Sequence, residues 1–280
     1  MIGAVAYDPK VVTIWEGFRQ WLRKTGVDTD FVLYSNYERQ VEDLLTSRID
    51  LAWNSPLAWI RSGRLAQARG LQVQPLFMRD SDRDLRTAVV TWADTGISDI
   101  GDLRGQTVAV GAVDSPQATL LPLSLLRSLG LDPANDFEVQ RFDVGVGLHG
   151  DHIGGEREAM IALREGRVRA ACVTDSNLLL FSREGTINGS ALSVIAQTDA
   201  YDHCMMTVAP DADQGSVDRL REVFLGMSYA DPELRALLDL EGLTAWLPGR
   251  TQGYALLERA VDEAGFYDPE GRIIVDDYRP

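Results

Sequence analysis

The sequence predicts an α/β protein built as two lobes, between which the chain crosses twice. Short apolar strands alternate with amphipathic helices along most of the 280 residues, a pattern typical of mainly parallel sheets covered by helices. A weak internal echo links residues 48–55 to residues 167–174, because each stretch runs from a helix into a strand and then into small polar side chains. Since no linker, low-complexity tract or charge block divides the chain, two crossings between the lobes fit better than domains in series.

The first half of the chain contains the elements expected of one lobe. Strands are predicted at Ile2–Tyr7, Phe31–Tyr34, Ile49–Trp53 and Thr87–Trp92. The first helix has apolar residues at helical spacing and a glycine just past its end, at Val11, Ile14, Phe18, Leu22 and Gly26. A short second helix is expected at Tyr37–Ser47. The strongly charged stretch Arg79–Arg86 is expected to be solvated.

The second half repeats the alternation and then becomes helical. Further strands are predicted at Thr107–Val110, Glu138–Phe142, Val168–Val173 and Ala191–Gln197. Helices are predicted from Ser115 to about Gly130, and at Glu156–Arg164, Val217–Met227, Asp231–Leu238 and Tyr254–Ala264. The ending, Gly271–Pro280, is polar and at best strand-like.

Composition excludes several classes of partner. The formal net charge of −15 argues against nucleic acid and against an anionic membrane surface. No apolar run approaches the roughly 18–20 residues needed to cross a bilayer, so we expect no membrane insertion. Cys172 and Cys204 do not make a disulfide framework. Because no export signal precedes the first strand, we expect a cytoplasmic protein, or a periplasmic or extracellular one if such a signal has been removed.

Small polar residues at strand ends are the first candidates for a ligand site. In open α/β sheets, ligands bind beyond the carboxyl ends of strands, and Tyr7, Asn54 and Ser55 follow such ends. Ser115 before Pro116 is a helix-start signal, and free amides at that helix start, next to Gln117, could hold an anion. The alternative for Asn54, Ser55 and Ser115 is a helix cap without a ligand.

The glycine-punctuated loop Asp143–Glu156 is the second candidate. It carries His149 and His152 on an open backbone, and His203 is expected to face it from the junction of the lobes. We expect His152 and His203 to contact the ligand, with His149 and the strand-end Asp175 as further contacts. Weaker alternatives are a metal held by the three histidines with Glu156, and Cys204 as a nucleophile. A pair within His203–Cys204 is disfavoured, because adjacent strand residues face opposite sides.

Several of these segments, in order, resemble the type II periplasmic-binding (Venus-flytrap) proteins, and most closely their phosphate/phosphonate-binding branch. The stretch 102–110, Asp-Leu-Arg-Gly-Gln-Thr-Val-Ala-Val, is similar to the opening of that family's second lobe. The segment His149–Gly166 is similar to its loop and following helix, and residues 45–56, 115–119 and 231–242 fit as well.

The resemblance implies two α/β lobes that close over a ligand about a two-strand hinge. It assigns residues 1–88 and 204–280 to the first lobe and residues 89–203 to the second. The hinge strands would be Thr87–Trp92 and His203–Val208. Ser115-Pro116-Gln117-Ala118-Thr119 stands where the family has a grip richer in hydroxyls, which puts phosphonate itself in question as the ligand.

Two functions follow as hypotheses. The first is a binding protein for a small polar or anionic molecule, with an ABC transporter permease as partner only if the protein is exported. The second is a cytosolic lyase or isomerase on the same fold, with His152 and His203 as acid and base, acting on a small carboxylate or heterocyclic metabolite. Neither hypothesis calls for a cofactor or a metal. The expected ligand contacts are Tyr7, Asn54, Ser55, Ser115, Gln117, His149, His152, Asp175 and His203.

Overall fold

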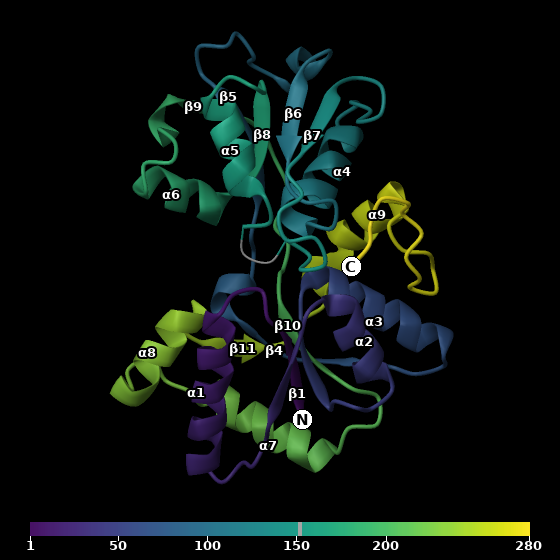
Figure 1. Cartoon of the computed structure of the whole chain (residues 1–280), viewed down its shortest axis with the longest axis vertical. Coiled ribbons are helices and arrows are strands. Elements are labelled where there is room, and N and C mark those ends of the chain that lie inside the picture. Colours follow the sequence, from purple (N-terminus) through teal and green to yellow (C-terminus); the bar gives the residue numbers. More distant parts are fainter. Residues whose placement is uncertain (151–152) are drawn as a thin grey trace.

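A computed structural model describes residues 1–150 and 153–280 and confirms the two-lobed α/β architecture (Figure 1). One sheet has six strands in the order β11-β4-β10-β3-β1-β2, and the other has five in the order β7-β6-β8-β5-β9. We call the parts built on them the first and the second lobe. Among the described residues, no helix is long and apolar enough to cross a membrane.

The first lobe combines the N-terminal βα units with strands that return from later in the chain. Its strands are β1 (Ile2–Val5), β2 (Phe31–Tyr34), β3 (Leu51–Asn54), β4 (Gln74–Arg79), β10 (Met205–Val208) and β11 (Trp246–Pro248). Its helices are α1 (Lys10–Lys24), α2 (Tyr37–Leu45), α3 (Pro56–Ala68), α7 (Gln214–Leu225) and α8 (Pro232–Glu241). Strands β1, β2 and β3 are parallel, whereas β10 is antiparallel to β3 and β4. The largest core cluster lies here, around the stacked rings of Phe77 and Phe224.

The second lobe is formed by the middle of the chain. Its strands are β5 (Thr87–Trp92), β6 (Thr107–Val110), β7 (Glu138–Arg141), β8 (Ala170–Thr174) and β9 (Leu192–Gln197). The π-helical turn η3 (Pro116–Leu120) leads into α4 (Leu121–Ser128), followed by α5 (Glu156–Arg164) and α6 (Asp175–Arg183). The α6 helix was not predicted, and it begins directly at the end of β8, where the Thr174 hydroxyl caps it by accepting from the Asn177 amide.

Two segments of chain join the lobes. Residues 80–86 connect β4 to β5, residues 198–204 connect β9 to β10, and the two segments meet at an antiparallel bridge between Leu85 and Tyr201. The hinge strands were therefore placed a few residues too late: Thr87–Trp92 pairs with β8 and β9 inside the second sheet, and Met205–Val208 lies inside the first. Their apolar sequence reflects burial within a sheet.

The C-terminal part of the chain packs at the junction of the lobes (Figure 1). Helix α9 (Ala255–Ala264) contacts α4 and η3 of the second lobe as well as α3 of the first. Within the polar ending Gly271–Pro280, Tyr278 is buried, in a cluster with Phe266, Tyr267, Leu57 of α3 and Leu121 of α4. The C-terminal segment therefore adds an apolar contact across both lobes.

Candidate functional site

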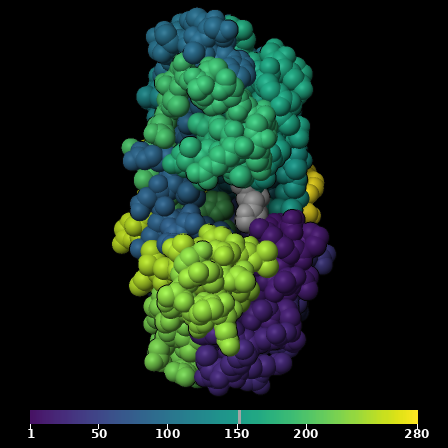
Figure 2. Space-filling view, turned by 90° about the vertical axis from the view of Figure 1, so that its left-hand side faces the viewer, coloured from purple at the N-terminus to yellow at the C-terminus, as the bar shows by residue number. Residues whose placement is uncertain are grey.

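A polar cavity of about 260 Å³ lies between the two lobes; Figure 2 shows the hollow between them from one side. Its first-lobe lining comes from the start of α1, the crossing segments and the end of α8: Lys10, Arg79, Ser81, Asp82, Leu85, His203, Asp239, Leu240, Glu241 and Gly242. Its second-lobe lining consists of Gln117, Thr174, Ser176 and Asn177. A larger cavity of about 520 Å³ lies at the base of the first lobe, and because no residue of the second lobe lines it, it is not an interlobe site.

The first-lobe wall contains a buried chain of charged groups. Arg79 donates from Nε and Nη2 to the two carboxylate oxygens of Asp82, at 2.6 and 2.9 Å, and Nη1 donates to the Glu241 carbonyl at 2.9 Å. Burial by itself would raise the pKa of Asp82, but the Arg79 guanidinium and the His203 imidazole lower it well below its ordinary value. The segment 79–86 was expected to be solvated, and that was wrong for Arg79 and Asp82, which are buried because they neutralise each other.

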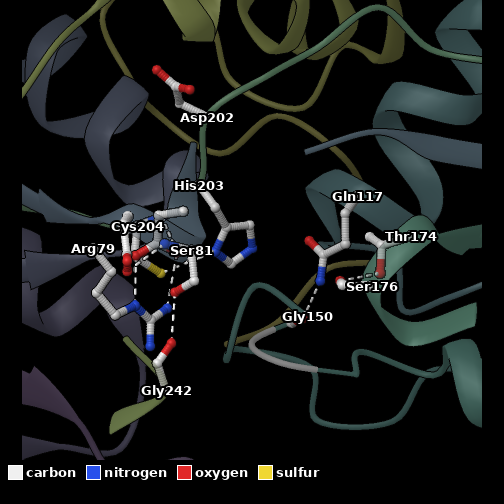
Figure 3. A network of polar contacts seen from close by, with 12 residues as sticks. Arg79, Ser81, Gln117, Gly150, Thr174, Ser176, Asp202, His203, Cys204 and Gly242 are labelled. Carbon is white, nitrogen blue, oxygen red and sulfur yellow. Dashed lines mark hydrogen bonds and ion pairs between the residues drawn. The ribbon is translucent and has the colours of Figure 1, made fainter. Parts of the chain in front are cut away.

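His203 lies between this charged pair and the cavity (Figure 3). Its Nδ1 is 3.4 Å from an Asp82 carboxylate oxygen and 3.1 Å from the Cys204 sulfur. A carboxylate next to Nδ1 orients the ring, so that Nε2 is the nitrogen available to a ligand. The prediction that His203 faces away from Cys204 was wrong, because both residues precede β10 and are not held in strand geometry.

The chemistry of this corner does not suit a metal ion. The ligand atoms of Asp82, His203 and Cys204 lie within 4.8 Å of one another. Both Asp82 oxygens already accept hydrogen bonds from Arg79, and the positive guanidinium would repel a cation. Of the described residues of the predicted metal alternative, His149 contacts Ser55 and Glu38, whereas Glu156 contacts Thr174. The remaining member of that loop, His152, lies outside the described residues.

The second-lobe wall is held from behind by a buried carboxyl group. One oxygen of Glu156 accepts from the Thr174 amide at 2.8 Å, from the Thr174 hydroxyl at 3.1 Å and from the Asn177 side chain at 3.1 Å. The other oxygen, Oε1, has no partner among the described residues. Burial raises the pKa of Glu156 to about 7, and these hydrogen bonds only partly offset it.

Gln117 is the predicted ligand contact that this wall presents most directly. Its Nε2 donates to the carbonyl of Gly150, and its Oε1 is buried without a partner among the described residues. In Figure 3 this oxygen points toward His203, which lines the same cavity from the first lobe. Ser115 caps the helix start by accepting from the Ala118 amide at 3.2 Å, and it does not line the cavity.

The other predicted contacts lie outside the cavity lining. Tyr7 is half-buried against the first-lobe core, with its ring 6.0 Å from the Lys10 ammonium. Asn54 is fully buried and bonds to Gln40, Ser62 and Thr207 within the first lobe. Asp175 is half-buried as the first residue of α6.

His149 and Ser55, predicted as separate ligand contacts, contact each other instead. The Ser55 hydroxyl lies 2.7 Å from His149 Nδ1, and both residues are fully buried. The structure thus brings Gln117 and His203 to one cavity, and it brings Ser55 and His149 together outside the lining of that cavity.

Apart from Gln117 and His203, the lining residues were not predicted as contacts, and among those missed are Lys10, Arg79, Asp82 and Asn177. Lys10 carried a usable signal, since it is one of only two lysines and follows the first strand at the start of a helix. Arg79 and Asp82 carried none, because their spacing of three residues does not distinguish a buried pair from a solvated one.

Comparison with known proteins places this geometry in a family. Residues 2–254 match the family described as "ABC transporter, phosphonate, periplasmic substrate-binding protein". The fold is similar to that of PhnD1 from Prochlorococcus marinus in complex with methylphosphonate, with a TM-score of 0.67 and 16% identity over 94% of this chain and 97% of that one. It is also similar to a Xanthomonas citri protein bound to a chloride ion, with a TM-score of 0.69 and 17% identity over 94% and 98%.

A third similar structure is the aliphatic sulphonate binding protein SsuA from Escherichia coli, with a TM-score of 0.58 and 17% identity over 94% and 90% of the two chains. These structures share the two-lobed architecture expected from the sequence. The family match covers both lobes and the crossings that line the cavity. The chain belongs to the periplasmic phosphonate substrate-binding proteins of ABC transporters.

Proposed function

We propose that the interlobe cavity captures a small organic oxyanion of the phosphonate class for delivery to an ABC transporter. Binding of a small polar or anionic molecule is the activity of the family, and neither the family nor its structural neighbours support the enzyme alternative. The family is periplasmic, which favours the exported location over the cytoplasmic one that we expected.

The observation that carries the proposal is the balance of charge in the cavity. Arg79 is neutralised by Asp82 and Glu241, so its charge is not available to a ligand. Lys10 forms no ion pair among the described residues, so it is the lysine or arginine charge of the lining that remains for a ligand. Asp239 adds one more carboxylate to the lining, where it accepts a hydrogen bond from the Tyr229 hydroxyl. An oxyanion between Lys10 and the opposite wall would meet positive charge from one lobe and hydrogen-bond donors from the other.

The opposite wall supplies those donors at a helix start. Thr174, Ser176 and Asn177 lie at the N-terminus of α6, where the helix dipole is positive. Their backbone amides already donate to Glu156, Asp175 and Thr174, so this wall would offer an oxyanion the helix dipole and the Ser176 hydroxyl. His203 and Gln117 would contact the rest of the ligand. A cavity of about 260 Å³ is at the small end of ligand sites, which favours a ligand of few atoms.

Calorimetric titration with methylphosphonate, methanesulfonate, inorganic phosphate and acetate tests the proposal. We expect methylphosphonate to bind, and Lys10→Ala to weaken it roughly 10- to 100-fold, because one charged contact is lost. Lys24→Ala is the matched control, since Lys24 lies at the other end of α1, where it pairs with Glu233 of α8, and it does not line the cavity. Absence of phosphonate binding, or equal effects of the two lysine variants, would reject the proposal.

A further inference from the structure

We propose that His149 is a positioning residue that fastens the second lobe to the first outside the ligand cavity and so holds the binding cleft in its closed shape. His149 belongs to the loop between β7 and α5 of the second lobe, and its side chain is fully buried. It does not line the cavity. The inference goes beyond the proposed function, because it concerns how the lobes are held and not which ligand they hold.

Each of the ring contacts that support this role reaches the first lobe. The Nδ1 atom lies 2.7 Å from the Ser55 hydroxyl at the start of α3, and Nε2 lies 2.9 Å from a carboxylate oxygen of Glu38 in α2. The ring stacks on Tyr37 with centroids 4.8 Å apart and planes 14° apart. We call His149 with Tyr37, Glu38 and Ser55 the interlobe latch.

The backbone of the loop is shaped to deliver the ring to this position. The carboxylate of Asp114, in the second lobe, accepts from the amides of Gly147 and His149 at 2.7 and 3.1 Å. The Gly147 carbonyl in turn accepts from the Tyr37 amide at 3.2 Å, which adds a backbone contact between the lobes. His149 has a φ of 50°, a left-handed conformation that non-glycine residues adopt at a cost when their contacts hold them there.

The latch also stabilises a charge that would be costly to bury alone. Burial by itself would raise the pKa of Glu38, yet the neighbouring His149 lowers it below its ordinary value, and the Tyr267 hydroxyl donates to the same oxygen at 3.1 Å. Separation of the lobes would remove His149 from Glu38 and Ser55. The arrangement of the lobes seen here is therefore stabilised by groups outside the cavity lining.

A short path connects the latch to the cavity. Gly150 follows His149, and its carbonyl accepts from the Gln117 side-chain amide (Figure 3). This contact turns the other end of that amide toward the cavity, so a shift of the loop moves a group of the cavity wall. Gly150 lies close to Ser115, since a Cβ at Gly150, which has a φ of 63°, would lie 2.3 Å from the Ser115 hydroxyl oxygen.

The test compares wild type, His149→Ala, Ser55→Ala and the double variant by small-angle X-ray scattering without ligand and by titration with methylphosphonate. We expect His149→Ala to increase the ligand-free radius of gyration and to weaken methylphosphonate at least roughly fivefold, through faster dissociation. The two substitutions should be non-additive, since they remove the same contact. Val144→Ala, at an exposed position of the same loop, is the control expected to match wild type.

Two further features keep the test decisive. His149→Gln keeps a polar side chain in the buried site and is measured alongside, so that a folding defect of the alanine variant does not end the comparison. The scattering measurement needs no ligand. If methylphosphonate does not bind, that result counts against the proposed function, while the radius of gyration still tests the interlobe latch. A folded His149→Ala or His149→Gln protein with the wild-type radius of gyration and, where methylphosphonate binds, the wild-type affinity would overturn the inference.

Discussion

Replacement of Glu156 by glutamine should change how the stability of the protein depends on pH. Burial raises the pKa of Glu156 to about 7, whereas the ordinary value is 4.5. Between these values the folded protein retains a proton that the unfolded chain has released. The free energy of unfolding therefore falls as the pH rises through this window, and the loss is complete above the folded-state pKa.

The expected magnitude follows from the size of this shift. A difference of about 2.5 pKa units at about 1.36 kcal/mol each corresponds to roughly 3 kcal/mol, lost between about pH 4.5 and pH 7.5. Glutamine keeps an oxygen that can accept from Thr174 and Asn177, but it does not titrate. The stability of Glu156→Gln relative to wild type should therefore rise by roughly 3 kcal/mol from the acid to the alkaline end of this window.

Urea unfolding followed by circular dichroism between pH 5 and pH 8 measures the difference directly, because other titrating groups contribute equally to both proteins. Glu158→Gln, at an exposed position of the same helix, is the matched control and should give a curve parallel to wild type. If the curves of wild type and Glu156→Gln also run parallel over this range, the burial argument for Glu156 is refuted.

Two further substitutions test the packing around the site. Asp82→Asn should cost about 3 kcal/mol of unfolding free energy in urea, because it removes the bidentate partner of the buried Arg79; a cost below about 1 kcal/mol would contradict a buried ion pair. Gly166 has a φ of 72°, and no atom lies within 4 Å of the position that a Cβ would take. Gly166→Ala should therefore lower the free energy of unfolding by about 1 kcal/mol, from left-handed strain alone. Gly155→Ala should lower the free energy of unfolding by roughly 2 kcal/mol more than Gly166→Ala does, since its Cβ would lie 2.1 Å from the Phe142 carbonyl oxygen. Equal losses of stability for the two variants in thermal melts would count against this clash.

Local sequence signals predicted much of the fold. The predicted caps at Ser55 and Ser115 are present, each accepting from the amide three residues later. The helix predicted at Glu156–Arg164 has those bounds, and the predicted start at Asp231-Pro232 is present, with Asp231 as the N-cap of α8. Such features depend on residues within one turn of each other, so a short stretch of sequence contains the whole interaction.

The candidate site was predicted in part. Gln117 and His203 do line the cavity, because strand ends and helix starts gather at the edges where the lobes meet. Lys10 follows the first strand in the same way and could have been found by this rule. For His149 the sequence indicated an accessible loop histidine, whereas the structure buries it against the other lobe.

By itself, then, the sequence determined the two α/β lobes, their order along the chain and most helix starts. Tertiary structure alone decided which polar residues are buried. Arg79 meets Glu241, and His149 meets Glu38, across 162 and 111 residues of sequence respectively. A charged or imidazole side chain can be buried only where a distant partner offsets its loss of water, and no local pattern contains that partner.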